Sequence, residues 1–311
     1  MMKSICLALM LAATAACKGK PDGATAIAAQ PADTLPVPAK TAEAPVDTIL
    51  RRTVYMRTDS LCIVGLLSDT VKGNDVLHYA RRFIGRPYVA ATLEVADPER
   101  LVVNTRQMDC TTLVETALAL AMTHREGGRT LEAYCHNLER LRYRDGRMDG
   151  YLSRLHYFTW WMHDNIRKGI LREVRDDAHF TAPIRVANHY MSRHADKYPL
   201  LVKHPEWVDS IARMERAANG PDGTYLPEAS TALSRKELRC IESGDLVAIV
   251  TRKDGIDYSH LGIAVWGRDG RLHLLNASSI HHKVVEEPKT LRQYLREHPS
   301  SIGIRLFRLE L

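Results

Sequence analysis

The 311-residue sequence lacks several patterns that would place it in a specialised structural class. After the first 16 residues there is no run of about 20 apolar residues, which excludes a protein that crosses a membrane several times. No block repeats at a fixed period, so we expect neither a solenoid nor a propeller. Apolar residues make up 45% and charged residues 26%, as in ordinary globular proteins, which excludes wholesale disorder.

Patterns for metal sites are also missing. No two cysteines stand in C-x-x-C spacing, and the motif His-Glu-x-x-His does not occur. We therefore expect no metal site and no cofactor. The net charge is only +6, which would suit an anionic polymer without indicating one. We expect no nucleic-acid partner.

Residues 1–17 have the features of a signal peptide. Lys3 supplies a positive start, an apolar stretch follows, and small residues at 14–16 precede Cys17. A cysteine at this place predicts bacterial lipoprotein processing with lipid attached to Cys17, although Thr14 stands where an aliphatic residue is usual. An ordinary secretory signal is the alternative. We expect an exported protein that is periplasmic or associated with the outer membrane. The lipid anchor would attach it to the membrane.

The rest of the chain divides into a linker and one domain. Residues 18–50 are rich in Ala, Pro and Thr, which predicts a flexible tether. Residues 51–311 begin with helical patterns, and β-rich runs separated by turns follow Gly244. This order predicts an α+β domain. Within it, we expect Asp97-Pro98 to open a short helix, with Asp97 as its cap.

A cysteine stands at the start of the clearest predicted helix, residues 109–122. There the unpaired N–H groups and the helix dipole favour the thiolate form of Cys110, and Asp109 is well placed as the helix cap. Cys62, Cys135 and Cys240 also fall in the predicted domain, and the sequence does not indicate how any of the four would pair. A cysteine hydrolase further needs a histidine as base and a polar residue that orients it.

The β-rich end of the chain offers both partners. His260 precedes one predicted strand and Asn276 ends the next. If residues 268–270 form a three-residue loop, Gly262 faces Asn276, and His260 lies diagonal to Asn276 on the same face of the sheet. A two-residue turn would instead place the two side chains on opposite faces.

Eight short motifs follow one another in an order that resembles a known family. They are Gly-Arg-Pro-Tyr (85–88), Leu-Val-Val-Asn (101–104), Asp-Cys-Thr-Thr-Leu-Val-Glu (109–115), Tyr-Arg-Asp-Gly (143–146), Tyr-Leu-Ser-Arg-Leu-His-Tyr (151–157), Gly-Asp-Leu-Val (244–247), Ser-His-Leu-Gly-Ile (259–263) and Leu-Asn-Ala-Ser-Ser (275–279). Together they resemble the NlpC-type, papain-fold peptidoglycan hydrolases, and more specifically the family described as N-acetylmuramoyl-L-alanine amidase-like. The resemblance covers about residues 73–307.

The resemblance implies a papain-like (NlpC-type) cysteine hydrolase fold with a helical insertion at about 125–240. It also implies that Cys110 is the nucleophile, His260 the base and Asn276 the orienting residue. Histidine is common at the last position in such proteins, but an asparagine carbonyl can also accept from the imidazole. Tyr88 matches a tyrosine that lies beside the nucleophile in related hydrolases.

Further candidates for binding the substrate or the oxyanion are Tyr88, Asp109, Thr111, Arg154 and His156. Packing is an equally good interpretation of Tyr88. The aromatic stretch that contains Arg154 and His156 is more typical of a core than of a sugar-binding platform.

The implied activity is hydrolysis of the amide bond between N-acetylmuramic acid and L-alanine, with peptidoglycan fragments (muropeptides) as partners. Two alternatives stay open. One is an endopeptidase that cuts the stem peptide between D-glutamate and the diamino acid. The other is a lipoprotein that binds the cell wall without turnover, against which the presence of both Cys110 and His260 argues.

Overall fold

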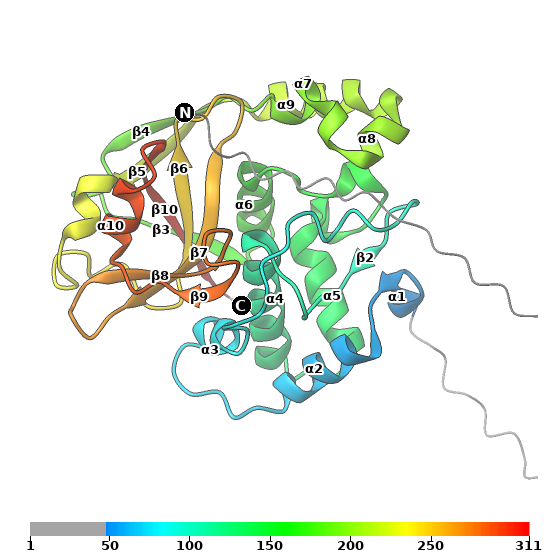
Figure 1. The fold of residues 1–311 in the computed structure, drawn as a ribbon, viewed down its shortest axis with the longest axis horizontal. Helices are drawn as coiled ribbons and strands as arrows, with labels where there is room; N and C mark the ends of the chain where they lie inside the picture. Colours follow the sequence, from blue (N-terminus) through cyan, green and yellow to red (C-terminus); the bar gives the residue numbers. More distant parts are fainter. Residues whose placement is uncertain (1–47, 311) are drawn as a thin grey trace, which may run out of the picture. The chain divides into compact units, whose positions relative to one another are not determined.

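The computed structural model describes residues 48–310, so the predicted signal peptide, Cys17 and most of the tether lie outside the described residues. The described part combines ten α-helices with a mainly antiparallel eight-stranded sheet (Figure 1). This agrees with the predicted α+β class. The helices are α1 (Thr48–Arg51), α2 (Arg57–Leu67), α3 (Asp75–Arg81), α4 (Cys110–Arg125), α5 (Leu131–Arg142), α6 (Phe158–Arg167), α7 (Tyr190–Arg193), α8 (Pro199–Lys203), α9 (Val208–Ala218) and α10 (Leu291–Arg296).

The strands form one large sheet and one small pair. They are β1 (Thr53–Val54), β2 (Leu101–Val102), β3 (Leu171–Val174), β4 (Ala182–Val186), β5 (Gly220–Pro227), β6 (Leu246–Thr251), β7 (Tyr258–Trp266), β8 (Leu272–Ser278), β9 (Lys283–Glu286) and β10 (Ser301–Leu309). β1 pairs with β2, and the large sheet has the order β4-β5-β10-β6-β7-β8-β9, with β3 also paired to β10. β6 to β9 thus form an antiparallel meander.

The central strands are apolar on both faces because both faces of the sheet are covered. On β6, Leu246 and Ala248 belong to the core cluster that also contains α4. The alternate residues Val247 and Ile249 belong to a second cluster with Leu291 of α10. A strand buried on both sides reads as a continuous hydrophobic run rather than an alternating one, and residues 246–250 do so.

Helix α4 lies at the centre of the domain, against the sheet and between α3 and α5 (Figure 1). Its residues from Thr112 to Thr123 are all buried. A helix buried along so much of its length is a core helix, and packing fixes its position in the domain. Its first residue is Cys110, which is only partly buried.

Two local expectations need correction. The stretch 125–240, predicted to be a helical insertion, contains α5 to α9 but also supplies β3, β4 and β5 to the sheet. No helix begins at Asp97-Pro98. The Asp97 carboxylate instead binds His204 Nε2 at 2.9 Å and pairs with Lys203, so it fixes a loop to α8 rather than capping a helix.

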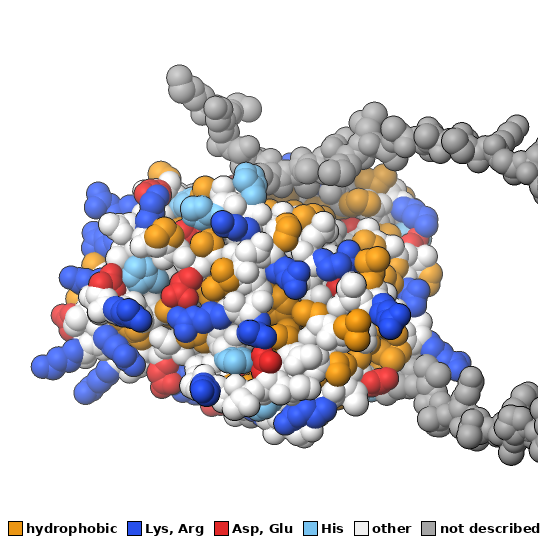
Figure 2. Space-filling model, turned by 60° about the horizontal axis from the view of Figure 1, so that its bottom comes forward, with side chains coloured by type: hydrophobic (Ala, Val, Ile, Leu, Met, Phe, Trp, Pro, Cys, Tyr) orange, Lys and Arg blue, Asp and Glu red, His pale blue; other side chains and the backbone are white. Residues whose placement is uncertain are grey.

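On the face drawn in Figure 2, Lys and Arg side chains are spread among acidic, apolar and neutral ones. Within residues 48–310, no helix is both long enough and apolar enough to cross a bilayer.

Candidate active site

The start of α4 is fixed by a capping box. Asp109 has extended backbone geometry, and its Oδ1 accepts from the backbone N–H of Thr112 at 2.8 Å. In return, the Asp109 N–H donates to Thr112 Oγ1 at 2.9 Å. This reciprocal cap sets Cys110 as the first helical residue, where the helix dipole favours an anion. Asp109 therefore acts on the backbone, and its carboxylate is already engaged there.

His260 and Asn276 come from neighbouring strands. The Gly267 N–H donates to the carbonyl of Arg271, and Gly270 has a left-handed φ of 72°, which gives the three-residue turn expected at 268–270. In the resulting β7–β8 register, His260 Nε2 lies 3.0 Å from Asn276 Oδ1. The same face of the sheet therefore carries both side chains.

The partners of Asn276 determine which nitrogen of His260 holds the proton. Asn276 Nδ2 donates to Glu287 Oε1 at 3.0 Å, and a carboxylate oxygen can only accept. The amide oxygen must then face His260, so Nε2 of His260 is the donor. In the neutral ring, Nδ1 is consequently the free base.

Cys110 lies next to this imidazole. Both residues line one pocket of about 220 Å³. Burial opposes protonation of His260, but Cys110 and the hydrogen bond to Asn276 favour the protonated ring, and together they raise its pKa above the ordinary value. An imidazolium stabilised by a neighbouring sulfur is the arrangement that activates a thiol as a nucleophile.

Polar and apolar side chains line the pocket together. Thr111 and His156 line it beside Cys110 and His260, and its lining also includes Met191 from the 125–240 stretch. Residues from distant parts of the chain thus line one pocket. Such a mixture of apolar surface and a few convergent polar groups is typical of a ligand pocket.

His156 is a pocket-lining residue that is neutral at neutral pH. Its Nε2 donates to the backbone carbonyl of Tyr151 at 3.0 Å, which leaves Nδ1 as an acceptor. Burial, followed by the nearby charge of Arg154, lowers the pKa of His156 to about 3. At neutral pH this ring can accept a hydrogen bond but carries no charge.

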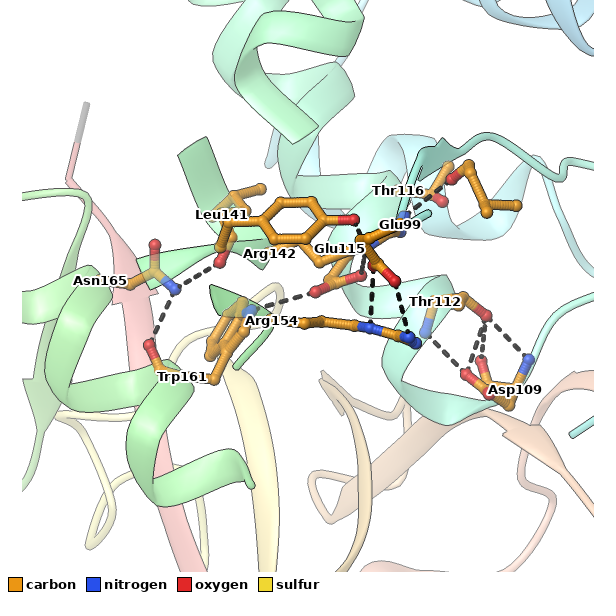
Figure 3. A network of polar contacts seen from close by, with 12 residues as sticks. Glu99, Asp109, Thr112, Glu115, Thr116, Leu141, Arg142, Arg154, Trp161 and Asn165 are labelled. Carbon is orange, nitrogen blue, oxygen red and sulfur yellow. Dashed lines mark hydrogen bonds and ion pairs between the residues drawn. The ribbon is translucent and has the colours of Figure 1, made fainter. Parts of the chain in front are cut away.

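The structure places Arg154 away from the pocket. Its side chain is 6% exposed, and its guanidinium pairs with Glu94 at 2.8 Å. It also pairs with Glu99 at 3.1 Å, as Figure 3 shows. In the same region, Arg142 pairs with Glu115 of α4 at 2.8 Å. Arg154 therefore belongs to a buried polar network behind the site, in which its charge is already matched.

Tyr88 lies in a segment that joins the two halves of the site. Its N–H donates to the carbonyl of His282 at 2.9 Å, next to β9. On the other side, the N–H of Met108 donates to the carbonyl of Pro87 at 3.0 Å, two residues before Cys110. Tyr88 itself is half-buried and is not among the residues that line the 220 Å³ pocket.

The sequence analysis did not identify two acidic residues that lie at or next to the site. Asp257 lines the pocket and is 6% exposed. It accepts from the N–H groups of Thr159 at 2.7 Å and Tyr258 at 2.8 Å, while burial raises its pKa. Glu287, the partner of Asn276, is also buried. Neither stands at a recognisable motif spacing, because strand pairing rather than sequence proximity brings Glu287 to the site.

None of the four cysteines among the described residues, Cys62, Cys110, Cys135 and Cys240, forms a disulfide. Across residues 48–310, no group of three or more His, Cys, Asp or Glu side chains is arranged to hold a metal ion.

This α+β domain has Cys110 and His260 at one pocket and Asn276 hydrogen-bonded to His260, which are features of a hydrolase. A model of the family described as AmiA-like, N-acetylmuramoyl-L-alanine amidase-like, matches residues 78–304. The chain therefore belongs to this amidase-like family of peptidoglycan hydrolases. A search among curated proteins found no match.

Solved structures agree with this assignment. A crystal structure named as an N-acetylmuramoyl-L-alanine amidase, from Bacteroides uniformis, is 38% identical and has a TM-score of 0.70; the match covers 77% of this chain and 100% of that one. A Bacteroides fragilis protein named as a candidate xylanase is 40% identical, with a TM-score of 0.70 over 75% of this chain and 100% of that one. A Legionella pneumophila protein at 20% identity and a TM-score of 0.65 shares the fold, over 82% of this chain and 95% of that one.

Proposed function

We propose that the protein is a cysteine-dependent amidase that hydrolyses the bond between N-acetylmuramic acid and L-alanine in muropeptides. The observation that carries this proposal is the hydrogen-bonded pair His260–Asn276, whose orientation leaves a free base beside Cys110 at the start of α4. A core helix that presents a cysteine to an antiparallel sheet bearing the histidine is also the basis for assigning a papain-like (NlpC-type) fold.

The reaction follows from the positions of these groups. His260 Nδ1 takes the proton of the Cys110 thiol, and the sulfur attacks the lactyl carbonyl carbon of the muramic acid. The backbone N–H of Cys110 at the helix start stabilises the oxyanion, with Tyr88 as the candidate second donor. His260 then protonates the amine of L-alanine as the C–N bond breaks, which releases the stem peptide. Water hydrolyses the thioester, which returns the thiol and frees the muramic acid carboxylate.

The lining of the pocket supports an amide-containing substrate. His156 offers a neutral acceptor, and Thr111 offers a hydroxyl next to the nucleophile. Asp257 adds a further acceptor at the same pocket. Peptide N–H groups are matching donors for such acceptors.

The test is digestion of purified muropeptides followed by mass spectrometry. The proposal predicts free stem peptide as the product. A cut within the stem would indicate an endopeptidase, and no product would indicate a binding protein; either result would overturn the amidase proposal. Cys110→Ala is the matched control, and it should abolish turnover while leaving the thermal unfolding temperature close to that of the wild type, because Cys110 is only partly buried.

We further propose that the protein is exported and held at the membrane by lipid on Cys17. The basis is the short apolar stretch followed by small residues and a cysteine. Metabolic labelling with a palmitate analogue tests this proposal. Label on the wild type but not on Cys17→Ser is the expected result, and an unlabelled wild type would refute the anchor.

A further inference from the structure

Glu287 lies immediately after β9 and forms the last buried link of the polar chain that begins at Cys110. Its side chain is 3% exposed. Oε1 accepts from Asn276 Nδ2 at 3.0 Å, and Oε2 lies 3.2 Å from Nε2 of the exposed His281. A carboxylate with this little exposure needs hydrogen-bond donors for its oxygens, and these two side chains supply them.

We propose that Glu287 is a positioning residue that selects the orientation of the Asn276 amide and thereby the tautomer of His260. This inference rests on the proposed role of Cys110 as a nucleophile. Glu287 is not among the residues that line the pocket, and its hydrogen bond to Asn276 links it to His260.

An asparagine amide has two possible orientations beside a histidine. Asparagine can present either its oxygen or its NH₂ group to His260, and the two orientations differ by a half-turn of the side chain. With the NH₂ group toward His260, Nε2 would have to accept, and the ring proton would move to Nδ1. Nδ1 would then have no lone pair with which to take the thiol proton. A carboxylate beside the other end of the amide excludes this orientation, because two oxygens would face each other.

The backbone holds Glu287 in place for this role. Its N–H donates to the carbonyl of Leu274 at 2.8 Å, and its own carbonyl lies 3.1 Å from Nδ1 of His273. Both partners are on β8, the strand that carries Asn276. The carboxylate and the amide are therefore positioned by the same strand, which limits how far they can move apart.

Charge acts in the same direction as orientation. Glu287 is one of the groups that raise the pKa of His260, after Cys110 and Asn276. The ring of Tyr294 lies 6.3 Å from His260, and Asp257 and His156 face the shared pocket. Among these groups, Glu287 is the one that contacts both the orienting amide and the exposed His281.

The test measures the thiol directly and does not depend on the substrate. The rate at which iodoacetamide alkylates Cys110 is followed against pH in the full-length protein, for wild type, Glu287→Gln and Glu286→Gln. Glu286 is the matched control, because its partly exposed carboxylate pairs with Arg81 and does not reach Asn276.

Glu287→Gln should slow alkylation near pH 6.5 by about 3–10-fold and should converge with wild type above about pH 9.5, where the thiol is ionised regardless of His260. Glu286→Gln should follow the wild type throughout. A merely structural role would lower the rate equally at all pH values, and that result would overturn the proposal.

A double-mutant cycle tests the route of the effect. If Glu287 acts through the amide, its replacement should change the rate near pH 6.5 by less than about 2-fold in an Asn276→Ala background. Additive effects would contradict this route.

A further measurement needs no variant and covers the case in which Glu287→Gln does not fold. The ¹⁵N chemical shifts of the neutral His260 ring in the wild type should show a proton on Nε2 and none on Nδ1. The opposite tautomer would refute the proposal. These readouts remain informative even if muropeptide digestion fails, so the two proposals can be told apart.

Discussion

His260 and Asn276 meet across the β7–β8 pair although they are not direct partners in the register. Ile263 is opposite Leu275, so one step further Asn276 is opposite Gly262, and His260 reaches it diagonally. Gly262 makes this close approach possible, because a Cβ at that position would come within 2.7 Å of the backbone oxygen of Leu275. The strand that carries the base is therefore kept close to the strand that carries its orienting residue.

Replacing the orienting amide should slow the reaction without weakening binding. Asn276→Ala should lower kcat by about 10–10³-fold with little change in KM, because the imidazole loses the partner that fixes its tautomer. Asn276→His should restore much of the activity, since a second imidazole can also accept from Nε2. The measurement is steady-state hydrolysis of a purified muropeptide. Equal activity of wild type and Asn276→Ala would remove Asn276 from the catalytic group.

The four thiols should differ in their reactivity toward iodoacetamide near neutral pH. Cys110 should react first, because the helix start and His260 both favour its thiolate. Cys135 is fully buried, and burial together with the hydrogen bond to Asp176 raises the pKa of Cys240 to about 11. Peptide mapping after brief labelling gives the order. Uniformly slow labelling of Cys62, Cys110, Cys135 and Cys240 in the folded protein would contradict an activated Cys110.

The ion pair between Arg142 and Glu115 should matter to stability far more than a surface pair. Their side chains are 3% and 2% exposed, so Arg142→Met would leave a buried carboxylate without its charge partner. We expect the free energy of unfolding to fall by about 3–5 kcal/mol. The control is Lys289→Gln, whose partner Glu297 is half-exposed, with an expected loss below about 1 kcal/mol. Urea denaturation measures both, and similar losses would refute the difference.

His156 should make the domain less stable in acid. Its pKa is about 3 in the folded protein, below the ordinary value of 6.5, so between these limits the unfolded chain binds a proton that the folded chain does not. The stabilising contribution is thus complete above pH 6.5 and is lost as the pH falls toward 3. When the pH falls from 7 to 4.5, the wild type should lose about 2–3 kcal/mol more unfolding free energy than His156→Gln does.

Urea denaturation at each pH measures the free energy of unfolding of the wild type and of His156→Gln. A His156→Gln curve parallel to that of the wild type would show that His156 is not held neutral.

Local signals in the sequence were sufficient to predict the start of α4 and the length of the β7–β8 turn. The Asp109 cap and the apolar faces of 109–122 are encoded within a few residues, and the left-handed Gly270 fixes the loop length. That loop length alone determines whether His260 and Asn276 share a face.

Features that depend on contacts between residues far apart in the sequence could not be predicted from such local signals. β3 and β5 lie in the predicted helical insertion, but their partner β10 is at the other end of the chain. Arg154 was a candidate for substrate binding, but its charge is matched by Glu94 and Glu99, more than 50 positions away. Likewise, Asp97 does not cap a helix, because its carboxylate binds Lys203 of α8 and His204 just after it.

The segment 85–88 links the backbone just before Cys110 to the sheet that carries His260. Main-chain hydrogen bonds join the segment on one side to Val284 and His282 and on the other to Met108. These bonds involve no side chain that lines the pocket. In evolutionary terms, pocket-lining residues such as Met191 and Tyr198 can be replaced while Cys110 and His260 keep their geometry. Such replacements can change which peptidoglycan fragment the pocket prefers.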